Sequence, residues 1–399
     1  MRNTVRYTTQ TELDNDSPSQ NKESSVSIIN YFLLVVILVL NPLLSLFAVA
    51  LLNFFVSINK KLLYIYAFVY TILIVNREYY VRFGESNGDD TVRYIPFIRE
   101  MLNLDISDAL ITQRDIFSIE PVPRLIWWVE TQLGLDVNVI IFIQALVWVF
   151  SLIFLAEKIS SRFSFVILFI GICFFSYTVP YTFFHLYRQA WALSFFILYI
   201  VLFESRWRYF LLVLACLSHL LIIPVFIAIE LLVKKIKPSN ILMLLITIFL
   251  LSYLLWEPIS AKFFAYSSVD NLNYNPFKSL IYSILFFMLF HLSKHNNELL
   301  LITRYLFFFL IAIYTIALFP FLADIANRYV LLLSPVLIMM TAPLSVRYRW
   351  VLFILFALSA VKLMVMLISD GNIYSFVING SLDFFNPIDA IVFYFQRSI

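Results

Sequence analysis

Long apolar runs dominate the chain from about residue 28 to its C-terminus, and short polar turns separate them. Most of the runs approach the roughly 20 apolar residues that an α-helix needs to cross the hydrocarbon core of a bilayer. The pattern predicts an all-α, polytopic integral membrane protein with roughly 11 or 12 transmembrane helices. The runs are residues 28–56, 62–75, 137–156, 163–178, 186–203, 207–233, 241–256, 280–292, 299–319, 325–342 and 350–368.

A long polar break interrupts this pattern early in the chain, at residues 77–121. Apolar and polar positions alternate over the short stretch that follows, 122–133, which predicts an amphipathic helix lying in the membrane interface. Residues 1–27 are polar and carry charges of both signs, so we expect a mobile tail there. Residues 28–399 are then expected to form a single membrane domain with one large outer loop.

Composition supports the membrane assignment, since 62% of the 399 residues are hydrophobic and 13% are charged. The net charge of +3 is too small to suggest a polyanionic partner, so no nucleic acid is expected. Lys and Arg gather in one set of alternate turns, which assigns those turns to the cytoplasm and the long polar loop to the outer face. Asn41-Pro42 can kink or divide the first run, so the side of the N-terminus stays open.

The run at 207–233 has basic residues on both sides. Both of its ends can lie in the cytoplasm only if the run enters the membrane and returns. We therefore expect a break near Ser218-His219 and Pro224, with His219 facing the outer side, because irregular backbone at membrane depth must line protein or a cavity. The flanking residues are Arg206, Arg208, Lys234, Lys235 and Lys237.

The outer loop is unusual in its charges, with six arginines, nine acidic residues and no lysine between residues 77 and 124. The planar donors of arginine suit carboxylate or phosphate partners, although an internal network of salt bridges explains the same bias. Glu120 has two interpretations. It is either an acid beside a helix N-terminus, where the helix dipole favours it, or a carboxylate that contacts a hydroxylated substrate.

Two predicted helix starts on the outer side carry an arginine, Arg188 after His185 and Arg328 after Asp324 and Asn327. Such an arginine can simply extend to the lipid headgroups. Next to a helix N-terminus in a low dielectric, however, a guanidinium also forms an anion site. We therefore expect the two arginines to face one cavity and to clamp the two phosphates of a pyrophosphate.

In order and spacing, these residues resemble the EpsG/Wzy-type membrane polymerases, which join lipid-linked repeat units into O-antigen, capsule or exopolysaccharide. The resemblance spans most of the chain. Asp89, Pro123 and Leu220-Leu221 depart from the family pattern, which leaves the donor sugar and the acceptor undecided. The matching motifs are Gly-x-Asp-x-x-x-Tyr at Gly88, Asp90 and Tyr94, Glu-Pro at Glu120-Pro121, Arg-Gln-x-x-Ala at Arg188, Gln189 and Ala192, Ser-His at Ser218-His219, and Arg-Tyr at Arg328-Tyr329.

The resemblance implies a metal-independent glycosyltransferase of the GT-C-like class in the bacterial inner membrane, with its active site facing the periplasm and without a cofactor. Donor and acceptor would both be oligosaccharide repeat units on undecaprenyl pyrophosphate, and membrane lipids would surround the protein. A flippase and a chain-length regulator would act with it. The sugars, the linkage, retention or inversion at the anomeric carbon, and the oligomeric state stay open.

The resemblance also implies roles for single residues. An attacking hydroxyl needs a base, for which Asp90, Glu120 and His219 are candidates and Asp90 is preferred. Arg188 and Arg328 would stabilise the charge of the departing pyrophosphate in place of a metal. The expected substrate contacts are Asp89, Arg93, Tyr94, Arg124, His185, Arg188, Gln189, Arg328 and Tyr329.

Two other functions use similar features. A flippase for the same lipid-linked glycan would need many helices and cationic residues, but it predicts an internal repeat, and no repeat of motif or loop is visible in the sequence. An O-antigen ligase would share the arginines and the outward histidine. It would differ in having a very large late outer loop, whereas here the largest outer loop is early.

Overall fold

The computed structural model describes five main stretches of the chain and a group of single positions near its C-terminal half. Within this part every regular element is helical, and none of its residues lies in a β-strand, as the all-α prediction requires. The tail at 1–27, the first apolar run, and the runs at 163–178, 241–256 and 350–368 lie outside the described residues. The described residues are 60–75, 90–111, 120–159, 182–183, 187–233, 280–281, 283–284, 287–288, 290–291, 298–316, 328–329, 332–333, 336 and 396.

The helices follow the apolar runs closely. The predicted runs at 62–75, 137–156, 186–203 and 299–319 correspond to α3, α7, α10 and α16, and the predicted amphipathic stretch corresponds to α6. The bounds are α3 Lys60–Val75, α4 Asp90–Glu100, the 3-10 helix η1 Met101–Asn103, α5 Ile106–Ile111, α6 Pro121–Gln132, α7 Val137–Ile159, α10 Tyr187–Val201, α11 Arg208–Ser218, α12 Ile222–Val233 and α16 Glu298–Ile316.

Local signals explain where α6 ends and α7 begins. Gly134 follows α6 with a φ of 75°, a left-handed conformation that glycine adopts at little cost. Its N–H donates to the Thr131 carbonyl, and the Leu135 N–H donates to the Glu130 carbonyl, so the last turn of α6 keeps its hydrogen bonds. Asp136 then accepts a hydrogen bond from the Asn138 N–H and caps the start of α7.

The break predicted within 207–233 is present. α11 ends at Ser218, His219 is extended with φ −159° and ψ 121°, and α12 begins three residues later. Pro224 does not mark the break as expected. It lies in the first turn of α12, where a proline is tolerated because the first helical N–H groups have no intrahelical acceptor.

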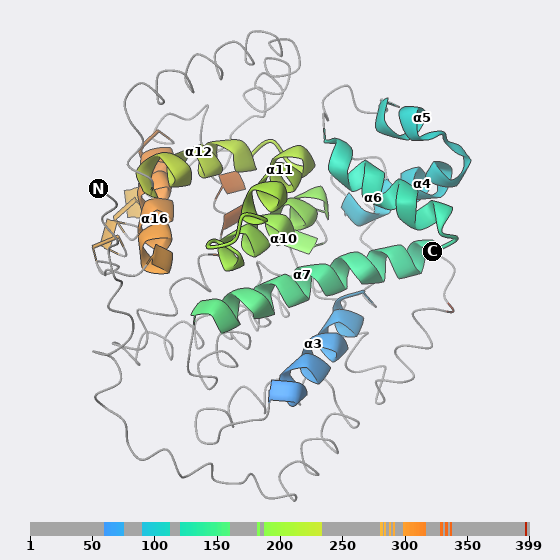
Figure 1. Ribbon diagram of the computed structural model, residues 1–399, viewed down its shortest axis with the longest axis horizontal. Helices are drawn as coiled ribbons and strands as arrows, with labels where there is room; N and C mark the ends of the chain where they lie inside the picture. Colours follow the sequence, from blue (N-terminus) through green and yellow to red (C-terminus); the bar gives the residue numbers. More distant parts are fainter. Residues whose placement is uncertain are drawn as a thin grey trace, which may run out of the picture.

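The helices pack around α7 and α10, as Figure 1 shows. α10 packs against both α7 and α11, α3 crosses α7 on its other side, and α12 lies against α16. α6 contacts η1, α4, α5, α7 and α11, so the described part of the polar loop at 77–121 lies beside α7 and α11. The buried core is formed by apolar and aromatic side chains shared among these helices.

Polar contacts mark one end of this bundle. The Tyr64 hydroxyl donates to Glu157 at 3.0 Å, which places the start of α3 beside the end of α7. Lys158 lies 3.6 Å from Glu204 in the turn between α10 and α11. The start of α3, the end of α7 and the α10–α11 turn therefore lie together, and these are the segments that carry the basic residues assigned to the cytoplasm.

One helix in the described part of the chain, Val137–Lys158, is long and apolar enough to cross a membrane by length and composition. Two shorter apolar helices cover Arg208–Ser218 and Arg304–Thr315.

Candidate functional site

Glu120 stands directly before α6, and its carboxylate does not cap that helix. Pro121 takes the first helical position, where its lack of an N–H costs nothing, and the Glu120 side chain forms no capping hydrogen bond. Instead the side chain is turned inward and is only 1% exposed. The start of α6 therefore positions Glu120, but its carboxylate interacts with residues outside α6.

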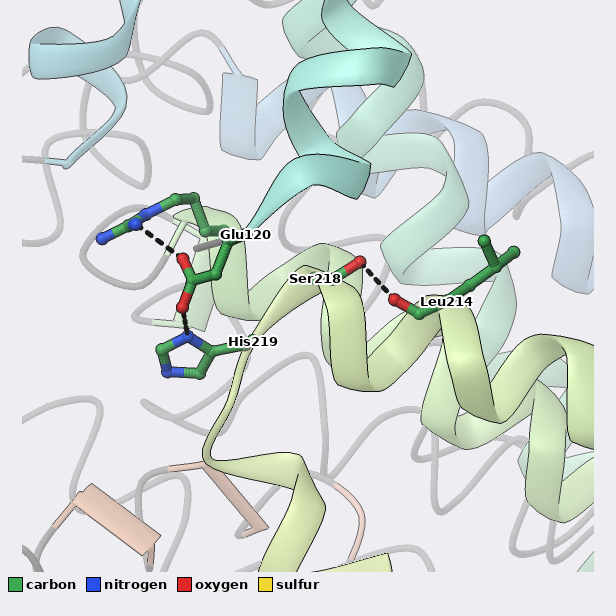
Figure 2. A network of polar contacts seen from close by, with 5 residues as sticks. Glu120, Leu214, Ser218 and His219 are labelled. Carbon is green, nitrogen blue, oxygen red and sulfur yellow. Dashed lines mark hydrogen bonds and ion pairs between the residues drawn. The ribbon is translucent and has the colours of Figure 1, made fainter. Parts of the chain in front are cut away.

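The carboxylate of Glu120 joins two residues that are far away in the sequence. Its Oε2 accepts a hydrogen bond from Arg188 Nη1 at 2.6 Å, and its Oε1 lies 2.5 Å from His219 Nδ1. Figure 2 shows this carboxylate in contact with His219, which lies at the point where the chain leaves α11. Three of the residues selected from the sequence thus meet at one place, and we call them the Glu120 cluster.

Each partner is positioned by a helix end. Arg188 is the second residue of α10, so its side chain projects from the first turn. His219 follows the last residue of α11; its N–H donates to the Ala215 carbonyl, and its own carbonyl accepts from the Ile222 N–H that opens α12. The Ser218 hydroxyl donates back to Leu214 within α11 and takes no part in the cluster (Figure 2).

The contact with Glu120 determines the tautomer of His219. An ionised carboxylate beside a guanidinium offers only acceptors, so the close contact requires a proton on Nδ1. In a neutral imidazole, the lone pair is then on Nε2. This Nε2 is buried, and it has no hydrogen-bond partner within the part of the chain that the structure describes. Nε2 is therefore the ring nitrogen that is left as an acceptor.

Three aromatic rings, those of Tyr94, Trp127 and Tyr187, pack together beside the Glu120 cluster. Trp127 of α6 and Tyr187 of α10 stack with their centroids 5.8 Å apart and 12° between the ring planes. Tyr94 of α4 lies 5.3 Å from Trp127 and 6.1 Å from Tyr187. The guanidinium of Arg188 lies 5.3 Å above the Tyr94 ring, within the range of a cation–π interaction. Arg188 is thus held from two sides, by a carboxylate and by an aromatic ring.

Helix α7 gives a measure of how deep this site lies. The amide of Gln144 donates to the carbonyl of Tyr187 at 2.7 Å, next to Arg188 in the chain. Gln144 lies seven residues after the first residue of α7, or about 10 Å along the helix. The Glu120 cluster therefore lies near the N-terminal half of α7, at about 10 Å from its first residue along the helix axis. The basic residues lie at the other end of α7.

Arg124, an expected substrate contact, lies among side chains that hold α6 against the preceding helices, and its contact with substrate stays a prediction. Its Nη1 donates to the Leu110 carbonyl at 3.2 Å, and its guanidinium lies 5.5 Å from the Phe97 ring centroid. Trp128 and Gln132, which follow on α6 at intervals of four residues, donate in the same way to carbonyls of residues 101–104. This row of donors attaches the described part of the outer loop to α6.

The structure describes only some of the other predicted substrate contacts. Gln189 is buried on α10, and its Oε1 accepts no hydrogen bond from the residues that the structure describes. Tyr329 packs against Phe309 of α16 at 5.2 Å, and Arg328 beside it is half-buried. The expected clamp by Arg188 and Arg328 stays a prediction. Asp89 and His185 lie outside the described residues, as do the side chains of Asp90 and Arg93, although Asp90 opens α4.

Sequence reasoning did not select Trp127 and Tyr187. With 42 Phe, 23 Tyr and 7 Trp in the chain, a single aromatic residue carries little information about a site. A usable signal was present nonetheless, because Tyr187 directly precedes Arg188, and Trp127 lies about two turns into the short helix that Glu120 precedes.

Glu130 is expected to make the protein less stable as the pH rises from about 4.5 to about 8. Burial in α6 raises the pKa of its carboxyl from 4.5 to about 8, and no described residue forms a hydrogen bond with its Oε2. The folded protein then keeps a proton that the unfolded chain releases, so each pH unit in this window lowers the free energy of unfolding by up to about 1.4 kcal/mol. Below the window both states are protonated, and above it both are ionised.

The measurement compares the unfolding free energies of the wild type and Glu130→Gln across this pH window. Their difference should change with pH within the window and be constant outside it. Parallel curves would show that Glu130 is ionised in the folded protein.

Comparison with protein-family models, curated proteins and solved structures finds no match to this chain. Among the described residues, no group of three or more His, Cys, Asp or Glu side chains is placed to hold a metal ion.

Proposed function

We propose that this chain is a polytopic membrane polymerase that joins undecaprenyl-pyrophosphate-linked oligosaccharide repeat units into a surface polysaccharide. The observation that carries the proposal is the Glu120 cluster. Its three residues come from three separate motifs of the polymerase resemblance, and they are in contact as an acid, a histidine and an arginine, of which the acid and the histidine are buried. A glycosyl transfer from a lipid pyrophosphate needs such groups, namely a base for the hydroxyl and positive charge near the leaving group.

The orientation of the bundle supports a reaction on the periplasmic side of the inner membrane. The start of α3, the end of α7 and the α10–α11 turn lie at one end and carry Lys60, Lys158 and Arg206. By the positive-inside rule this end faces the cytoplasm. The Glu120 cluster lies toward the opposite end, where lipid-linked repeat units would be presented after their transfer across the membrane.

The proposed reaction is a displacement at the anomeric carbon of the donor. A hydroxyl of the acceptor glycan attacks this carbon and gives its proton to His219 Nε2, while the bond from the carbon to the phosphate oxygen breaks. The undecaprenyl pyrophosphate leaves with the bonding electron pair. Glu120 stabilises the imidazolium that forms, and Arg188 contributes positive charge close to the leaving group.

This proposal changes the preferred base. The sequence favoured Asp90, but Glu120 and His219 are found in contact, and a carboxylate held by both Arg188 and His219 is better suited to orient the imidazole than to accept a proton itself. His219 is therefore the proposed base. Asp90, near the start of the outer-loop helices, is left as a contact for the glycan.

Deletion of the gene in the source bacterium tests the proposed function. Surface polysaccharide is extracted from the deletion strain and from the same strain complemented with the wild-type chain, and the lengths are separated on a gel. The proposal expects the deletion strain to lose the ladder of lengths and to keep a single repeat unit on its lipid acceptor.

Two other results would overturn the proposal and identify a different function. Long chains that accumulate without attachment to lipid would indicate a ligase. Repeat units that never reach the outer face, shown by their protection from an enzyme added outside the inner membrane, would indicate a flippase.

A further inference from the structure

A second buried polar contact lies at the far end of the helices that carry the Glu120 cluster. The hydroxyl of Tyr199 on α10 donates to Glu230 Oε1 on α12 at 2.7 Å. Both residues are buried, with exposed fractions of 0% and 7%. Arg208, at the start of α11, lies close enough for its charge to act on both. No motif of the sequence analysis includes this pair.

The contact shows that α11 and α12 form a helical hairpin. Tyr199 lies two residues before the end of α10, and α11 starts after a short turn from there. Glu230 lies three residues before the end of α12, so α12 returns to the end from which α11 departs. The tip of the hairpin is the break at 219–221, about 16 Å away along the 11 residues of α11.

Glu230 is the one polar residue of α12, whose sequence is otherwise aliphatic or aromatic apart from Pro224 and Ala228. Apolar side chains between lipid-embedded helices give little directional preference, because lipid tails are as apolar as the helices themselves. A hydrogen bond is directional and becomes costly to break where water is absent. The bond between Tyr199 and Glu230 therefore sets the rotation and the height of α12 against α10.

A rotation or shift of α12 would move His219 directly. The Ile222 N–H that opens α12 donates to the His219 carbonyl at 3.1 Å, and His219 is the extended residue between the two helices. The imidazole must in turn stay within hydrogen-bond distance of Glu120, so that the carboxylate holds the proton on Nδ1. The base of the hairpin and its tip are thus connected through one short and stiff helix.

We infer that Tyr199 and Glu230 are positioning residues, which hold the α11–α12 hairpin so that His219 stays against Glu120 with Nε2 ready to accept a proton. In assigning the consequence for catalysis, this inference rests on the proposed function. The geometric part stands independently of it, since the tautomer of His219 can be observed without any substrate.

The test uses nitrogen NMR of the full chain labelled with ¹⁵N-histidine in detergent micelles or nanodiscs. The chain has only four histidines, and His219→Ala identifies the signal of interest. In the wild type, His219 should show one protonated nitrogen, Nδ1, and one unprotonated nitrogen, Nε2. In Tyr199→Phe and Glu230→Leu, the two signals should move toward the average of exchanging tautomers. Glu230→Gln, whose amide oxygen still accepts from Tyr199, should keep the wild-type spectrum.

Ser194→Ala is the matched control. Ser194 is a buried hydroxyl on the same helix as Tyr199, but it donates to the Ala190 carbonyl within its own helix. Its removal should leave the spectrum of His219 unchanged. Circular dichroism and thermal unfolding show which variants are folded, and Tyr199→Phe, which loses one oxygen atom, decides the question if Glu230→Leu does not fold.

The same variants are then assayed for polymer formation. Tyr199→Phe should lower kcat about tenfold, the scale of one lost buried hydrogen bond, with little change in KM. A wild-type tautomer in a folded Tyr199→Phe protein would overturn the positioning role and leave the proposed function untouched. A changed tautomer in a protein whose wild type forms no polymer would keep the positioning role and overturn the proposed function. Averaged tautomers in the wild type would show that His219 is not held in the Nδ1-protonated form, which would overturn the inference.

Discussion

Replacing Glu120 by leucine is expected to lower the free energy of unfolding by roughly 3–5 kcal/mol, the scale of two lost hydrogen bonds to a charged group. The carboxylate is 1% exposed and is the acceptor for both Arg188 and His219. Leucine fills a similar volume but removes the acceptor for the guanidinium and for the Nδ1 proton, and the imidazole is 11% exposed. Thermal unfolding in detergent, together with titration by a denaturing detergent, gives the size of the loss.

The control for this variant is Glu204→Leu, because Glu204 forms an exposed and longer ion pair with Lys158 at 3.6 Å. That change should cost less than about 1 kcal/mol. The loss in the double variant Glu120→Leu with Arg188→Leu should be smaller than the sum of the two single losses, since both single variants break the same ion pair. Equal losses for Glu120→Leu and Glu204→Leu would contradict a buried cluster at Glu120.

Replacing His219 by alanine is expected to lower the rate of polymer formation by roughly 10²–10⁴-fold, the usual contribution of a general base. The acceptor hydroxyl would lose the group that takes its proton, while Glu120 would keep Arg188 as its partner and the fold would persist. The rate is measured from the growth of the glycan ladder in membranes that contain equal amounts of each variant.

Ser218→Ala is the matched control for the histidine, because the Ser218 hydroxyl donates to Leu214 within α11 and does not touch Glu120. It should polymerise at nearly the wild-type rate. If His219→Ala also stays within about tenfold of the wild type, a range below that of a lost general base, His219 is not the base and Asp90 becomes the first candidate again.

The helices could be predicted from the sequence where a long apolar run coincided with clear ends. α7 begins where predicted because Asp136 precedes a long, mostly apolar run, and α10 begins within one residue of its predicted start. The break at His219 was predicted because basic residues on both sides of one run require a return, and Ser218-His219 and Pro224 indicated its position. Pro224 was the wrong marker, because proline is tolerated in the first turn of a helix.

The sequence by itself determined the helical class and named Glu120, Arg188 and His219, because apolar periodicity and short motifs are local properties of the chain. Only the tertiary structure decided that these three residues touch. Glu120 is 68 residues from Arg188 and 99 from His219, and no local rule governs contacts across such separations. Packing also decided that the Glu120 carboxylate pairs with Arg188 instead of capping α6, and that Tyr199 meets Glu230, because a buried polar group takes the partner that the fold brings within hydrogen-bond distance.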